Sequence, residues 1–68
     1  MMSLAEINEQ YEQIMRSPAS NARDLALSRL MDRMKGEYRI PLLQDVEWEA
    51  KNRAVIAMYR KISMSRNL

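Results

Sequence analysis

The stretch VEWEAKNRAVIAMYRKISM, residues 46–64, decides the fold of this chain. At 100° per residue, five of its apolar side chains fall within one arc of about 100°, the stripe expected of a helix that packs on a core. They are Trp48, Val55, Met58, Tyr59 and Ile62. The pattern predicts a helix over 46–64 that buries this face.

The charges at the start of this stretch favour one continuous helix. Two glutamates are each followed four residues later by a basic residue, which is the favourable order for a helical ion pair. These pairs are Glu47 with Lys51 and Glu49 with Arg53. Asp45 is a suitable N-cap. In the alternative interpretation, Asn52 caps a shorter helix and residues 46–51 form a separate turn.

The first helix is expected over residues 4–16. Ser3 and Glu6 match a capping box, and apolar residues then recur at helical spacing. These are Leu4, Ile7, Tyr11, Ile14 and Met15. The other side of the helix is polar, so the apolar face is expected to lie on the core.

A second helix is expected over residues 18–35. Ser17 and Pro18 form a favoured combination of N-cap and first helical residue, whereas Ser20 would cap a helix that begins slightly later. Gly36, the only glycine, stands where a left-handed residue is wanted after a helix. The predicted buried stripe consists of Ala26, Leu27, Leu30, Met31 and Met34.

Small side chains occupy a second face of the last predicted helix. Ala50, Ala54 and Ala57 share this face and would allow another helix to approach closely. We predict that they form an interaction surface, together with Leu25, which falls off the buried stripe of the second helix. In the alternative interpretation, the alanines simply favour helix and Leu25 is one of the scattered leucines common on protein surfaces.

The connection between the second and third predicted helices is unusually apolar. It reads Ile40-Pro41-Leu42-Leu43, and the proline disfavours helix at this point. We expect the segment to cross the open end of the bundle as a plug, with Leu42 or Leu43 near Trp48. If it is exposed instead, it forms a hydrophobic peg for a second subunit.

The three stripes predict an all-α fold, a small three-helix bundle with helices at about 4–16, 18–35 and 46–64 in a single domain over 1–68. A chain of this size removes only about 60% of its unfolded surface from water. It contains no cysteine or histidine, so neither a disulfide nor a conventional zinc site reinforces the core. We therefore predict a homodimer.

The composition argues against an enzyme. Without histidine and cysteine, the chain lacks the commonest general base and the strongest side-chain nucleophile, and one glycine cannot build a phosphate-binding loop. Asp45, Glu47 and Glu49 match the opening of a calcium loop, but Ala50 and Ile56 stand where glycine and glutamate are needed. We expect no metal and no cofactor.

The net charge of +2 is unevenly placed: −2 over 1–16, +2 over 17–36, −3 over 37–50 and +5 over 51–68. Attraction between packed segments is the favoured explanation of this alternation. The alternative is a basic patch that meets an acidic partner or nucleic acid. Its candidate residues, which are spread around the helix, are Lys51, Arg53, Arg60, Lys61 and Arg66.

Elimination leaves protein interaction as the predicted function. No apolar run is long enough for a membrane span or a signal peptide, so we expect a cytoplasmic location without membrane binding. The chain is predicted to be a small non-enzymatic interaction module that self-associates, in the role of a regulator or adaptor. The alternative is nucleic-acid binding through a helix-turn-helix-like pair or the basic C-terminal helix.

Overall fold

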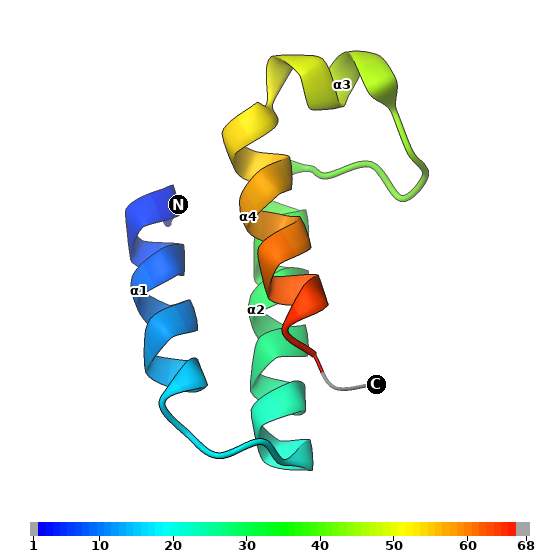
Figure 1. Ribbon diagram of the computed structural model, residues 1–68. Coiled ribbons are helices and arrows are strands. Elements are labelled where there is room, and N and C mark those ends of the chain that lie inside the picture. The colour runs from blue at the N-terminus through cyan, green and yellow to red at the C-terminus, as the bar shows by residue number, and fades with distance from the viewer. Residues whose placement is uncertain (1, 67–68) are drawn as a thin grey trace.

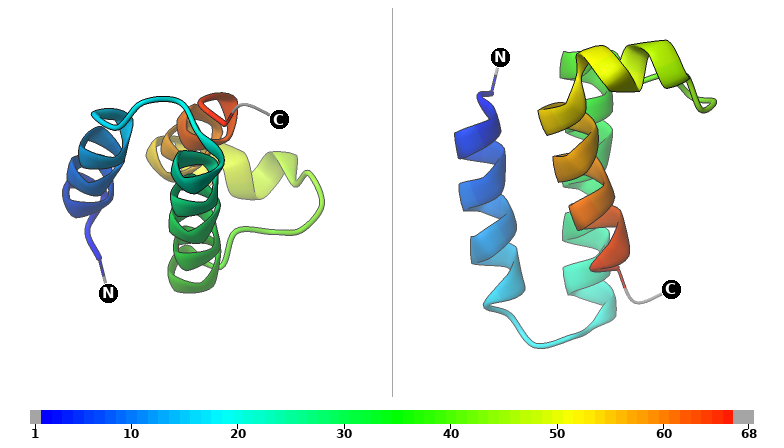
Figure 2. Two further views of the ribbon diagram at one scale, coloured as in Figure 1. Left: turned by 90° about the horizontal axis from the view of Figure 1, so that it is seen from below. Right: turned by 45° about the horizontal axis from the view of Figure 1, so that its top comes forward.

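The computed structural model describes residues 2–66, which form helices and connections without any strand. The helices are α1 (Leu4–Met15), α2 (Asn21–Tyr38), α3 (Val46–Lys51) and α4 (Arg53–Met64). In two views, α1, α2 and α4 lie side by side and α3 crosses the end of α4 (Figures 1 and 2). The predicted all-α bundle is confirmed.

Serine caps fix where the first two helices begin. In α1 the capping box is complete, because the Glu6 amide donates to Ser3 Oγ and the Ser3 amide donates to Glu6 Oε1, each at 3.1 Å. In α2 the Arg23 amide donates to Ser20 Oγ at 3.1 Å. The second helix therefore begins after Ser20, at the later of the two predicted positions, and Pro18 lies in the connection.

The predicted end of α2 at Gly36 is wrong. The helix continues to Tyr38, and the left-handed residue is Arg39, with φ 53° and ψ 47°. The extra turn allows the Tyr38 hydroxyl to donate to the Met2 carbonyl oxygen at 2.7 Å. It also places the Ile40 side chain in the core. Tertiary contacts beyond the glycine thus outweigh its preference for a helix end.

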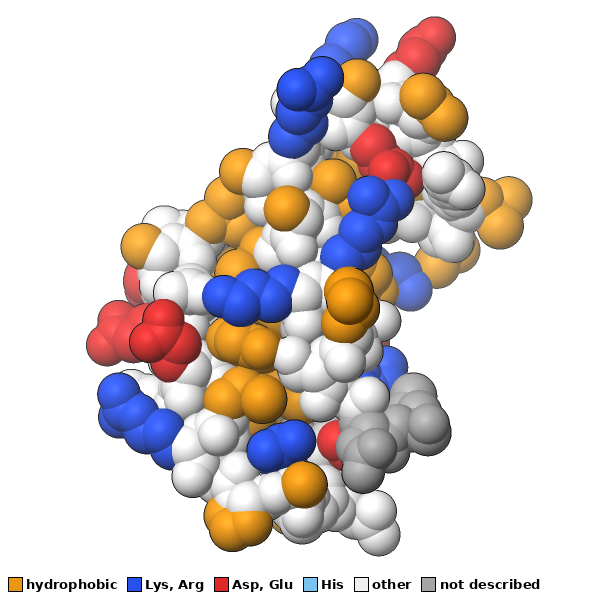
Figure 3. Space-filling model, in the orientation of Figure 1, with side chains coloured by type: hydrophobic (Ala, Val, Ile, Leu, Met, Phe, Trp, Pro, Cys, Tyr) orange, Lys and Arg blue, Asp and Glu red, His pale blue; other side chains and the backbone are white. Residues whose placement is uncertain are grey.

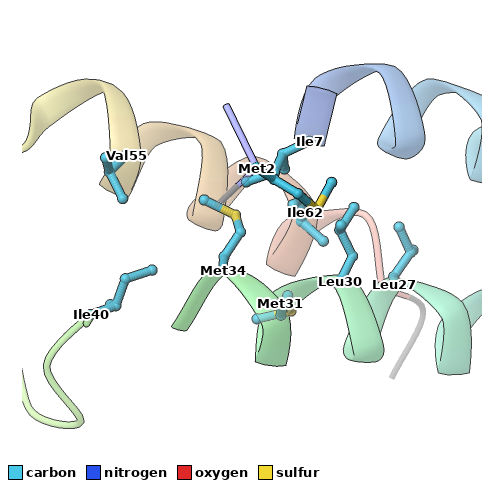
Figure 4. Packing of buried hydrophobic residues seen from close by; sticks show 9 residues of the cluster. All are labelled: Met2, Ile7, Leu27, Leu30, Met31, Met34, Ile40, Val55 and Ile62. Atoms are coloured by element: carbon cyan, nitrogen blue, oxygen red, sulfur yellow. The ribbon is translucent and has the colours of Figure 1, made fainter. Parts of the chain in front are cut away.

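The core draws on all three long helices and confirms the predicted stripes (Figure 4). Its buried residues are Met2, Ile7, Leu27, Leu30, Met31, Met34, Ile40, Val55 and Ile62. The remaining stripe residues except Ala26 are partly buried against this cluster, Trp48 and Tyr59 among them. Met2 was not predicted, and its amide donates to Glu37 Oε1 at 2.6 Å.

The prediction of one continuous helix over 46–64 is wrong, and the alternative is correct for the break at Asn52. It is wrong for residues 46–51, which form the helix α3 and not a turn, and the Asn52 side chain makes no cap hydrogen bond to α4. Asn52 leaves the helical region with φ −130° and ψ 45°, and its side-chain amide donates to the Trp48 carbonyl oxygen at 2.8 Å. A straight continuation of α4 would run past the end of α2 (Figure 1). The break instead brings Trp48 back against the core.

Candidate functional site

Residues 41–51, the end of the connection together with α3, form an arm that projects from the three packed helices (Figures 1 and 2). Among the helices of the described chain, α3 packs only against α4. Asp45 caps α3 by accepting the Trp48 amide at 3.0 Å, as predicted. The arm is thus a local structure built on one neighbour.

Three apolar side chains of the arm face solvent. Leu42 is 83% exposed, Leu43 is 84% exposed and Val46 is 74% exposed. The predicted plug is therefore wrong for both leucines, because Ile40 already fills the end of the core near Val55 (Figure 4). The exposed peg, the alternative interpretation, describes the observed position of Leu42 and Leu43.

A groove of about 430 Å³ lies between α3 and α4. We call it the α3–α4 groove, and its lining residues are Gln44, Val46, Glu49, Ala50, Arg53, Ile56, Ala57 and Arg60. It exists because the break at Asn52 turns two helical faces toward each other. Figure 3 shows hydrophobic side chains exposed among charged ones over this part of the molecule.

The structure brings together part of the predicted interaction surface. Ala50 and Ala57 line the α3–α4 groove, whereas Ala54 is exposed outside it. Leu25 is 52% exposed on α2 and does not line the groove. Ile56 also lines the groove but was not predicted, because its angle on the helix lies outside both predicted arcs.

One ion pair spans the groove. Arg60 Nη2 lies 2.6 Å from Glu49 Oε1, with the Arg60 side chain 55% exposed and that of Glu49 19% exposed. This contact replaces the predicted i,i+4 pairing of Glu49, because the break moves Arg53 out of helical register with it. Lys51 and Arg53 are exposed and have no ion-pair partner among residues 2–66.

The other residues of the predicted basic patch contact different parts of the bundle. Lys61 Nζ donates to Asn8 Oδ1 at 3.3 Å and lies 4.9 Å from the centre of the Tyr11 ring. Arg66 Nη1 approaches Met31 Sδ at 3.7 Å. Three of the five basic residues, including Arg60, are therefore engaged within the chain.

A smaller hollow of about 220 Å³ lies between α1 and α2. It is lined by Gln10, Ile14, Ala26, Arg29, Leu30 and Arg33. Arg33 is already paired with Glu37 at 3.2 Å. No large hydrophobic side chain exposed as fully as those of the arm lies in it, so the α3–α4 groove is the stronger candidate.

Residues 2–66 contain no group of three or more acidic side chains placed to hold a metal ion. Within the same range, none of the helices is both long enough and apolar enough to cross a membrane. No protein-family model, curated protein or solved structure matches this chain. The case for a function therefore depends on the arm and the α3–α4 groove.

Proposed function

We propose that this chain is a small non-enzymatic protein-interaction module that binds its partner through the arm and the α3–α4 groove. The observation that carries the proposal is the exposure of Leu42, Leu43 and Val46 beside a groove with apolar walls. Adjacent exposed apolar side chains of this kind mark interaction sites on small proteins. A role as a regulator or adaptor is compatible with a module of this size.

The free energies of burial and association favour a weak complex. Burying one large apolar side chain contributes about 1.5–3 kcal/mol, so the three exposed residues of the arm supply roughly 5–9 kcal/mol. Association costs about 4–15 kcal/mol in lost translational and rotational freedom. A useful affinity therefore requires the partner to fill the groove as well as to cover the arm.

The alternative functions have less support. The basic residues that would contact phosphates are dispersed, and three of them have partners within the chain. The groove presents an ion pair, Glu49 with Arg60, but no histidine or cysteine to act on a substrate. Protein binding is the function that uses the exposed apolar surface.

Site-specific photo-crosslinking in the cells that produce the protein tests this function. A photoreactive residue replaces Ala57 in the groove, and a matched control replaces Ala22, which is exposed in the first turn of α2. We expect protein adducts at position 57 and none at position 22. Equal labelling at both positions, no adduct at all, or adducts with nucleic acid alone would overturn the proposal.

A further inference from the structure

We propose that the occupant of the α3–α4 groove is a second copy of this chain, related by a two-fold axis, with Leu42 and Leu43 of each copy inserted in the groove of the other. This inference rests on the proposed function, because it names the partner for the same surface. It follows from two kinds of complementarity between the arm and the groove.

The first complementarity is apolar. Leu42 and Leu43 are exposed and do not line the groove of their own chain. The groove offers them Val46, Ala50, Ile56 and Ala57 as apolar walls. Because the leucines precede the α3 wall of the groove in the arm, a two-fold axis between two copies can place each pair of leucines in the groove of the other copy. An interface of this kind is isologous and closes at two copies.

The second complementarity is electrostatic. The leucines are followed along the arm by the acidic Glu47, and the groove has the basic Arg53 on its wall. Both side chains are exposed and lack an ion-pair partner among residues 2–66. In the proposed dimer, Glu47 of each copy lies opposite Arg53 of the other. The acidic block 37–50 and the basic block 51–68 then attract each other across the interface.

Charge reversal tests this arrangement. Glu47→Lys alone places two lysines opposite two arginines, and Arg53→Glu alone places two glutamates opposite two glutamates. Like charges across an interface oppose association. We expect each variant alone to have a dissociation constant about tenfold higher than that of the wild type, measured by sedimentation at low salt.

The mixture of the two variants is the decisive measurement. In the mixed dimer both contacts join opposite charges. One contact joins the lysine introduced by Glu47→Lys to the glutamate introduced by Arg53→Glu, and the other joins the unaltered Glu47 to the unaltered Arg53. We therefore expect near-wild-type affinity. Each altered chain is still present in the mixture, and recovery cannot come from improved folding. Failure of the mixture to associate better than either variant alone would overturn the proposed pairing.

Leucine variants test the apolar contact independently. Leu43→Asp is expected to weaken self-association at least about tenfold, because an aspartate would be desolvated in the groove. Leu25→Asp is the matched control, since Leu25 is exposed on α2 outside the arm. Equal effects of both variants on self-association, or no effect of Leu43→Asp, would contradict the insertion of Leu43 in the groove of the other copy.

The crosslinking experiment separates the two proposals. An adduct at position 57 with twice the mass of the chain supports the dimer. An adduct with a different protein, combined with a wild type that sediments only as the 8.0 kDa species at high concentration, would overturn the dimer and leave the proposed function standing. The absence of any adduct would overturn both.

Discussion

Arg60 of α4 donates from Nη2 to Oε1 of Glu49 in α3 at 2.6 Å, and this contact joins the two helices on either side of the break at Asn52. The two residues are eleven positions apart. The ion pair therefore has tertiary character, and it stabilises the angle between α3 and α4 that forms the groove.

The Glu49–Arg60 pair is expected to contribute about 0.2–1 kcal/mol, because the arginine is largely solvated. Glu49→Gln, Arg60→Gln and the double variant form a double-mutant cycle, measured by denaturant unfolding with Trp48 fluorescence. The coupling energy should fall as salt is added. A coupling near zero at low salt would show that the pair does not stabilise the angle.

Asn52→Ala is expected to straighten residues 46–64. The change removes the hydrogen bond to the Trp48 carbonyl oxygen and raises helix propensity by roughly 0.7 kcal/mol. Helical circular dichroism should increase, and the Trp48 emission should shift to longer wavelength as the ring leaves the core. Asn52→Asp also loses this hydrogen bond, because a carboxylate cannot donate one, but it keeps a poor helix former. If helix propensity decides the break, Asn52→Asp should change neither signal. Unchanged emission in Asn52→Ala would mean that core packing alone sets the break.

Gly36→Ala is expected to stabilise the fold by about 0.5–1 kcal/mol, because glycine is costly inside a helix. Gly36 has no positive φ, and an added Cβ would meet no atom within 4 Å beyond its chain neighbours and the backbone of its own helix. Arg39→Gly should also stabilise, by up to about 1 kcal/mol, since it relieves a left-handed residue. Thermal unfolding of each variant measures whether its stability rises as expected. Destabilisation by Gly36→Ala would instead indicate that Gly36 ends the helix.

Leu27→Ala and Leu25→Ala compare a buried and an exposed leucine on the same helix. The first should cost about 2–5 kcal/mol because it leaves a cavity in the core. The second should cost about 1 kcal/mol or less. A domain of this length has a total stability of roughly 3–10 kcal/mol, so Leu27→Ala is expected to leave much of the protein unfolded in denaturant titrations. Equal losses would contradict the assigned core.

Acidification should weaken the start of α1. Hydrogen bonding with Ser3 lowers the pKa of Glu6. The larger effect comes from the Ser3 backbone and the smaller from its side chain. The stabilisation is therefore complete above the pKa of an unfolded glutamate and is lost as the pH falls through the lower folded pKa. The advantage of the wild type over Glu6→Gln in melting temperature should shrink between about pH 5 and pH 3. An advantage independent of pH would contradict this origin.

Much of the fold was predictable because helical periodicity is a property of the sequence alone. The stripes that include Ile7, Leu27 and Ile62 were predicted and are buried, and the caps at Ser3 and Asp45 require only local hydrogen bonds. These features depend on residues no more than a few positions apart.

The candidate site was harder to predict because it depends on contacts that are distant in sequence. The charges of residues 46–53 suit a straight helix, and only the position of the core shows why the chain turns at Asn52. Leu42 and Leu43 are as apolar as Ile40, but one isoleucine suffices to fill that end of the core. The backbone of Met2 is held at the core by hydrogen bonds with Glu37 and Tyr38, which are 35 and 36 positions away in the sequence.

The attachment of α3 to a single helix gives the molecule two levels of stability. We expect the arm to unfold and refold while α1, α2 and α4 stay packed, because α3 packs against no described helix except α4 and Trp48 is the residue of the arm that packs against the core cluster. Amide hydrogens of residues 46–51 would then exchange through local opening, and those of Leu30 and Ile62 through global unfolding. A molecule that binds only the folded arm would slow the first process, and it would slow global unfolding by the same factor because the unfolded chain cannot bind it either. Slower exchange at residues 46–51 would therefore show that binding requires the folded arm, without knowledge of the bound molecule.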